Sequence, residues 1–242
     1  MFYRAGPPLF LLAFLAVVLI GVFVVLPVSM VAAAFGKLGL TGPQGMAVFL
    51  LTIAGSGWNI PVYRTTRLVR GDPAPASRFF HMNRIRFGQA QDDTLVVSEQ
   101  TVAVNVGGCL VPCVLSAWFI WQMQLSGGLG AWLGLCILIP ALACYLLARP
   151  MPGVGIAVPV LLPPAVAAMT AILLAPDLPD QASLAPRAAY MAGTLGTLIG
   201  ADVAHLVNRR TFALLDAPLL SIGGAGTFDG IFLAGIIAVL LA

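Results

Sequence analysis

The chain has 242 residues, of which 60% are hydrophobic and 9% charged, with a net charge of +3 and a mean hydropathy of +1.00. Soluble domains carry about 25% charged residues, so this composition excludes an ordinary water-soluble globular protein. A chain that cannot cover itself with polar groups needs lipid as its solvent. We therefore expect one polytopic membrane domain over residues 1–242, with the lipid bilayer as its surroundings.

Apolar stretches follow one another along most of the chain, and a membrane-spanning helix needs about 20 such residues. The seven candidates are Pro8–Phe35, Gly45–Val62, Val104–Gln122, Leu129–Ala148, Ala157–Ala175, Ala188–Val207 and Ala225–Ala242. The first is too long for the apolar part of a signal peptide, and Pro27 should kink it. The sequence predicts an all-α membrane protein with about seven transmembrane helices.

The positive charges give these predicted helices an orientation. If the N-terminus is cytoplasmic, ten of the 12 basic residues lie on the cytoplasmic side, and only Lys37 and Arg187 lie outside. Cytoplasmic loops of membrane proteins are enriched in Lys and Arg. We therefore predict a cytoplasmic N-terminus, an external C-terminus and a multi-pass arrangement in the cell (inner) membrane.

Residues 63–103 form the longest hydrophilic segment and are predicted to be a cytoplasmic loop. Its first part, residues 63–86, is basic with interleaved aromatic residues, which suits nucleic acid or anionic lipid headgroups. Because basic loops are the rule on this side of a membrane, we expect lipid headgroups and no nucleic acid. Its last part, TLVVSEQTVAVNV, alternates as strands do and predicts a short β-hairpin at the membrane surface.

The last two predicted helices each carry an aspartate at membrane depth, Asp202 and Asp229. Charged residues in membrane helices are costly and are candidates for function. The two helices are consecutive and antiparallel, and both aspartates lie near the predicted cytoplasmic face, so we expect them to be neighbours. Two carboxyl groups in a low-dielectric site share one proton, as in aspartic proteases, where one activates water and the other polarises the peptide carbonyl. We predict that Asp202 and Asp229 form a catalytic dyad.

Small and polar residues around this pair support a compact site. Gly224, Gly226 and Gly230 would let a substrate strand or a facing helix approach Asp229, although glycines are equally typical of helix packing. His205 lies three residues after Asp202, so Asp202, His205 and Asp229 could also hold a zinc ion.

No H-E-x-x-H motif is present and the four cysteines form no C-x-x-C pair, so we predict no metal and no cofactor. A purely structural alternative also stays open. In it Asp202 bonds His205 or a neighbouring helix, and Asp229 sits at the positive start of the last helix.

Three segments resemble an uncharacterised family of prokaryotic integral membrane proteins, domain-of-unknown-function family 1614. They are GSGWNIPV (Gly55–Val62), VAVNVGGCLVP (Val102–Pro112) and SIGGAGTFDGIFLAGIIA (Ser221–Ala238). The resemblance covers most of the chain. It implies a membrane protein and no particular activity.

The last two predicted helices also resemble, more weakly, intramembrane aspartyl proteases of the presenilin and signal-peptide-peptidase type. In that type the first aspartate follows a tyrosine and the second ends a Gly-x-Gly-Asp motif, whereas here Ala201 and Phe228 precede the two aspartates. The later Pro-Ala-Leu motif is absent, and Asn59 with Pro61 is the candidate replacement. This resemblance implies a hydrolase that cleaves a membrane protein or peptide.

Two other functions remain as alternatives. The Pro163–Pro164 pair should interrupt the fifth predicted helix, and broken helices mark binding sites in transporters. In a proton- or ion-coupled transporter, Asp202, Asp229 and His205 would bind or relay the ion. In a non-catalytic assembly subunit, the basic loop would dock a partner.

Overall fold

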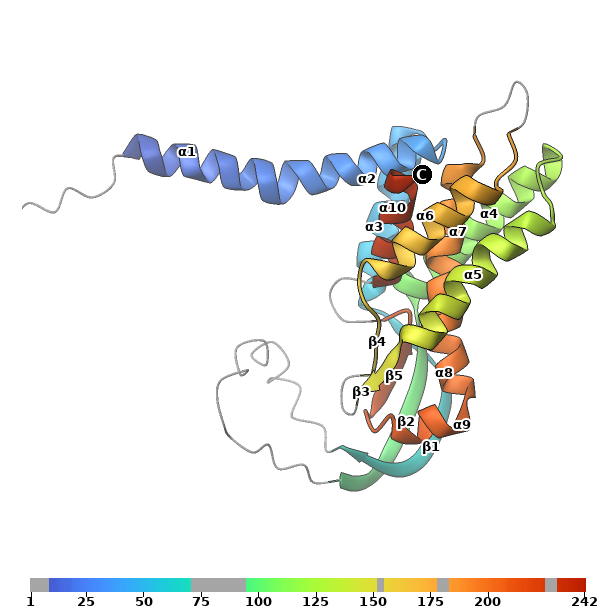
Figure 1. Cartoon of the computed structure of the whole chain (residues 1–242). Coiled ribbons are helices and arrows are strands. Elements are labelled where there is room, and N and C mark those ends of the chain that lie inside the picture. Colours follow the sequence, from blue (N-terminus) through green and yellow to red (C-terminus); the bar gives the residue numbers. More distant parts are fainter. Residues whose placement is uncertain (1–8, 71–94, 152–154, 178–182, 225–229) are drawn as a thin grey trace, which may run out of the picture.

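The computed structural model describes residues 9–70, 95–151, 155–177, 183–224 and 230–242 (Figure 1). They form a mostly helical protein with a three-stranded sheet at one end of a helix bundle (Figure 1). The α-helices of the bundle are α3 (Gly42–Ser56), α4 (Val111–Leu125), α5 (Ala131–Leu147), α6 (Leu162–Leu174), α7 (Ala185–Thr197) and α10 (Gly230–Leu241). Short helices α8 (Ala204–Val207) and α9 (Arg209–Leu214) lie at the sheet end.

An N-terminal arm projects away from the bundle (Figure 1). It is one continuous helix made of α1 (Leu9–Ile20), the π-helical turn η1 (Gly21–Val25) and α2 (Leu26–Lys37). The predicted disturbance at Pro27 takes the form of this wider turn, because proline lacks an N–H and crowds the preceding turn. The end of α2 is anchored to the bundle, because Lys37 Nζ donates to the carbonyl oxygen of Leu240 at the end of α10, at 3.1 Å.

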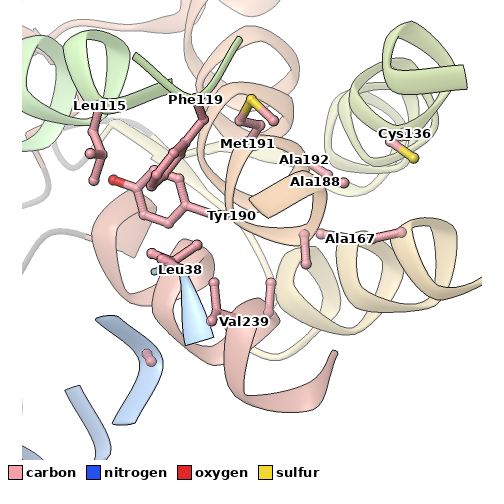
Figure 2. Close-up of a cluster of buried hydrophobic side chains, with 14 of the residues drawn as sticks. Leu38, Leu115, Phe119, Cys136, Ala167, Ala188, Tyr190, Met191, Ala192 and Val239 are labelled. Atoms are coloured by element: carbon pink, nitrogen blue, oxygen red, sulfur yellow. The ribbon is translucent and has the colours of Figure 1, made fainter. Parts of the chain in front are cut away.

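Helix α7 lies at the centre of the bundle and packs against α4, α5, α6 and α10. Figure 2 shows Tyr190 of α7 between Phe119 of α4 and Leu38. The Tyr190 and Phe119 rings meet edge to face, with their centroids 5.9 Å apart. Glycines let the helices approach closely, as helix packing predicts. A Cβ at Gly193 would lie 2.8 Å from the Ala234 carbonyl oxygen of α10.

The outer faces of these helices are apolar. Large hydrophobic side chains such as Trp121 of α4 and Leu173 of α6 are exposed. Two helical segments, Ala13–Lys37 and Val106–Leu125, are long and apolar enough to cross a membrane, and α5, α6 and α10 are shorter apolar helices. A soluble monomer rarely exposes so much contiguous apolar surface, so these faces suit contact with lipid.

Each of the seven predicted stretches contains helix, but the second, third and fifth also run into strands. The second stretch ends as helix at Ser56 and continues as strand β1 (Asn59–Arg70). In the fifth stretch, Pro163 and Pro164 do not interrupt a helix, because they lie in the first turn of α6. Backbone N–H groups in a first turn have no acceptor within the helix, so the N–H that proline lacks is not missed there. The proline argument for a broken helix therefore fails.

The sheet has the order β1–β2–β5. Strands β1 and β2 (Leu95–Asn105) form a long antiparallel hairpin, while β5 (Leu219–Ile222) pairs in parallel with β2 and forms an edge of the sheet. The buried Gln100 of β2 secures the approach to β5, because its Nε2 donates to the carbonyl oxygens of Leu215 and Ala217, both at 2.8 Å. A second, two-stranded sheet joins β3 (Arg149–Met151) and β4 (Gly155–Ala157).

The observed hairpin differs from the predicted one, because residues 95–105 form a single strand, β2, that pairs with β1. Its first strand includes RTTRLVR, which the sequence assigned to a basic loop. Much of the basic segment, including Arg78, Arg84 and Arg86, lies outside the described residues.

Candidate functional site

The three sequence segments that carry the family resemblance meet where the bundle joins the sheet. Asn105, 2% exposed, stands at this junction and caps the π-helical turn η4 (Val106–Leu110) that opens α4. Its Oδ1 accepts from the Gly108 amide at 2.8 Å. Its Nδ2 donates to the Ser56 carbonyl at 2.7 Å and to Asn59 Oδ1 at 3.2 Å. One amide side chain thus holds the end of α3, the start of β1 and the start of η4 together.

The end of β5 is tied to the same cluster. Ser221 Oγ donates to Asn59 Oδ1 at 2.5 Å. Gly223 follows with φ of +76°, and a Cβ there would lie 2.7 Å from the Gly108 carbonyl carbon and 2.8 Å from the Cys109 nitrogen. Only glycine satisfies both the left-handed backbone and this close approach. Gly224 is also required, because a Cβ there would clash with Ser221 Oγ.

Asp202 reaches this glycine segment from the bundle. It lies in η5 (Leu198–Val203), a π-helical segment that continues α7, and it is partly buried. Its Oδ2 accepts a hydrogen bond from the Gly223 amide at 2.7 Å. Bonds from an amide to a carboxylate are short and strong, so this contact fixes Asp202 against the turn after β5. π-Helical segments are often found at functional sites.

His205 supports the turn that carries Asp202. Its ring is buried, and Nδ1 lies 3.1 Å from the Gly200 carbonyl oxygen. A carbonyl only accepts, so Nδ1 carries the hydrogen and Nε2 is the acceptor in the neutral ring. The centroids of the Tyr145 and His205 rings are 4.8 Å apart. Asn208 Nδ2 donates to the Tyr145 hydroxyl at 3.2 Å.

The structure brings together part of the predicted site. The junction contains Asp202, Gly224 and Asn59. His205 contacts the Gly200 carbonyl and so supports the helical turn that carries Asp202. Pro61 lies two residues beyond Asn59 on β1, exposed at a register shift of the hairpin.

The remaining predicted residues concern the second aspartate. Asp229 and Gly226 lie outside the described residues, so the predicted dyad stays a prediction. Gly230 is the first residue of α10, and a Cβ there would meet nothing within 4 Å. Gly230 was expected to let another segment approach closely, but no described neighbour is near enough to require a glycine there.

Three residues of the junction were not predicted as site residues, namely Gly223 and the polar residues Asn105 and Ser221. The available signal was a polar side chain two residues before a pair of glycines in an otherwise apolar segment, as in VNVGG and LSIGG. Among the described residues no group of three His, Cys, Asp or Glu side chains could hold a metal ion.

Comparison with known proteins gives one match. The family model described as "Protein of unknown function (DUF1614)" matches residues 53–241. No curated protein and no solved structure matches the chain, so the resemblance to presenilin-type proteases gains no support from a relative. The matched region contains the whole junction and leaves out the N-terminal arm. Since it covers well over half of the chain, the protein belongs to the DUF1614 family.

Proposed function

We propose that this protein is a multi-pass protein of the cell (inner) membrane and an intramembrane aspartyl hydrolase, with Asp202 and Asp229 as its catalytic pair. The apolar outer faces of the helices support the membrane location. The described basic residues divide between the two ends of the bundle. Lys37 and Arg187 lie by the start of α3 and α7, while Arg64, Arg149, Arg209 and Arg210 lie at the sheet end. The positive-inside rule then favours a cytoplasmic sheet.

The observation that carries the proposal is the hydrogen bond between the Gly223 amide and Asp202 Oδ2, 2.7 Å long. It anchors the chain beside Asp202 six residues before Asp229. On the other side of Asp229, Ile231 of α10 shares a buried cluster with Leu198 of η5. Both flanks of the Asp229 segment are therefore held against the helix segment that carries Asp202, which supports a pairing of the two carboxyl groups.

The chemistry assigns different roles to the two groups. An amide donor stabilises the charged form of a carboxylate, so Asp202 is the base that takes a proton from water. Asp229 is the protonated partner that hydrogen-bonds the substrate carbonyl oxygen. The activated water then adds to the carbonyl carbon, the C–N bond breaks, and the amine leaves with a proton. The products are a carboxylic acid and an amine.

The sheet offers a route for the substrate, which we propose to be a membrane protein or peptide. Strand β5 is an edge of the three-stranded sheet and leads directly into Gly223. An extended segment that pairs with such an edge gains backbone hydrogen bonds without sequence specificity. A substrate added along β5 would end beside Asp202.

The test uses the full chain and a peptide probe that mimics the tetrahedral intermediate of aspartic proteases and carries a photoreactive group. The wild type should be labelled, and both Asp202→Asn and Asp229→Asn should lose labelling. Cleavage of membrane proteins, followed by the appearance of new N-termini in cells, should fall on the order of 10²–10⁴-fold in both variants.

Asp177→Asn is the matched control, because Asp177 is exposed near the end of α6, away from the sheet. It should retain labelling and cleavage. Full labelling and cleavage in either Asp202→Asn or Asp229→Asn, with the variant folded, contradicts the proposal.

Transport is the second candidate, favoured by the two π-helical segments η4 and η5. Both border the junction, and Cys109 of η4 shares a buried cluster with Leu198 of η5. Irregular helix segments expose backbone carbonyls that bind ions in transporters. Proton- or cation-dependent flux into liposomes that Asp202→Asn abolishes, without any cleavage activity, would favour this function over hydrolysis.

A further inference from the structure

We propose that α9 and the adjoining end of β3 form a binding surface for the headgroups of anionic phospholipids. This basic rim consists of Arg149, Arg209 and Arg210 with the exposed side chains of Val207 and Leu214. Arg149 opens β3 directly after α5, and the other two arginines open α9 directly after α8. Helix α9 lies beside β3, so the three arginines stand on neighbouring elements at the sheet end of the bundle (Figure 1).

A hydrogen bond places the ends of the two preceding helices at the same level. Asn208, which follows α8, donates through Nδ2 to the hydroxyl of Tyr145 in the last turn of α5, at 3.2 Å. The surface of both helices therefore changes from apolar to basic at one height along the bundle. That is the height at which a bilayer changes from acyl chains to headgroups.

The apolar side of this change is well exposed on both helices. Leu146 near the end of α5 is 69% exposed and Val207 at the end of α8 is 76% exposed. Arg149 and Arg209, two or three residues later, are also exposed. An apolar band that ends in arginines is the pattern of helices that leave a lipid leaflet.

Helix α9 itself is suited to lie at such a boundary. Phe212 turns inward and packs on the buried cluster beneath the sheet, while Leu214 is 58% exposed on the same turn and a half of helix as the exposed Arg209 and Arg210. In water the exposed side chain of Leu214 would make no stabilising apolar contact. At a membrane surface the leucine enters the acyl boundary and the guanidinium groups reach the phosphates.

The rim is held in place and its charge is available. Asn208 Oδ1 accepts from the Arg210 amide at 3.1 Å and so fixes the start of α9. Within the described ranges, no ion pair joins Arg149, Arg209 or Arg210 to a carboxylate. The exposed Val207 and Leu214 favour a lipid over a soluble anion, because only a lipid offers apolar surface next to its phosphate.

The test measures lipid binding by the purified full chain in neutral detergent, and it is independent of any catalytic activity. Phosphatidylglycerol added to the micelles should raise the thermal unfolding midpoint, while phosphatidylcholine should not. The variant with Arg149→Gln, Arg209→Gln and Arg210→Gln should bind phosphatidylglycerol on the order of 100-fold more weakly, about fivefold for each arginine. Replacement of the same three residues by lysine should retain most of the binding.

Arg187→Gln is the matched control, because Arg187 lies at the opposite end of the bundle, where it donates to the Leu38 carbonyl. It should bind phosphatidylglycerol as the wild type does. If the triple variant does not fold, each single glutamine variant is measured for its fivefold loss. Equal stabilisation by phosphatidylcholine, an equal effect of inorganic phosphate, or undiminished binding in the folded glutamine variants would overturn the proposal.

Discussion

Gly223 combines a left-handed backbone with a close approach to another segment of the chain. Gly223→Ala should destabilise the protein by about 1–2 kcal/mol through its backbone conformation, and by roughly a further 1–3 kcal/mol through the collision with Gly108 and Cys109. The thermal unfolding midpoint measures this loss. Gly127→Ala is the control, since Gly127 has a φ of +72° but open space around it. Equal losses in the two variants would mean that the contact with η4 contributes nothing.

His205 is expected to act by holding the π-helical turn rather than by touching a substrate. Asparagine can place its amide nitrogen where His205 Nδ1 lies 3.1 Å from the Gly200 carbonyl, whereas alanine offers no donor. His205→Ala should therefore cost about 1–3 kcal/mol of stability and should weaken labelling by the photoreactive probe. His205→Asn should restore much of both, and His205→Gln, with its donor farther out, should restore less. If the asparagine and alanine variants behave alike, the bond to Gly200 is not what His205 provides.

Residue-level signals in the sequence identified Asp202 but not what it contacts. A carboxylate in an apolar helix is conspicuous, because its insertion into lipid is costly. One of its partners is the backbone amide of Gly223, and no side chain in the sequence marks a backbone donor. The π-helical form of η5 was equally hidden, since helical periodicity looks the same whether one turn is wider or not.

At the scale of elements, one side chain holds the segment that leads into strand β5. Gln100 is fully buried and donates to the carbonyl oxygens of Leu215 and Ala217. Gln100→Leu keeps the volume but leaves both carbonyls without this donor, at a cost of roughly 1–3 kcal/mol each. Hydrogen exchange in residues 215–224 should quicken. Gln124→Leu, at an exposed position on α4, should leave exchange in this segment unchanged, and an equal effect of both variants would contradict the assignment.

The helices and the strand character of β2 were predictable, whereas the other two strands of the sheet were not. Runs of about 20 apolar residues can only be satisfied as helix in an apolar environment, so each predicted stretch contains one. Strand β1 escaped prediction because RTTRLVR has few large apolar residues, and its structure comes from pairing with β2 across residues 71–94. Strand β5 is only four residues long and pairs with a strand more than 100 residues earlier, which no local pattern can reveal.

For the whole molecule, the arm and the bundle are expected to be separable. The apolar window within Ala13–Lys37 is 0% buried against the rest of the described chain, and the family match begins only at residue 53. Deletion of residues 1–25 should leave the thermal unfolding midpoint and the monodispersity of the purified protein unchanged. By contrast, Lys37→Met removes the bond to the Leu240 carbonyl and should lower the midpoint modestly. A collapse of the deletion variant in detergent would show that the arm contributes to folding.

The parallel pairing of β2 with β5 also determines when the site can come into existence. Residues 101–104 leave the ribosome long before residues 219–222, which complete the sheet. Until then Asp202 has no Gly223 amide to bind, although its own helix has already been made. A chain made only as far as residue 218 therefore lacks the bond of Ser221 to Asn59 and the bond of Gly223 to Asp202. Folding order alone would keep a hydrolase of this design inactive toward neighbouring proteins until residues 219–223 have been synthesised.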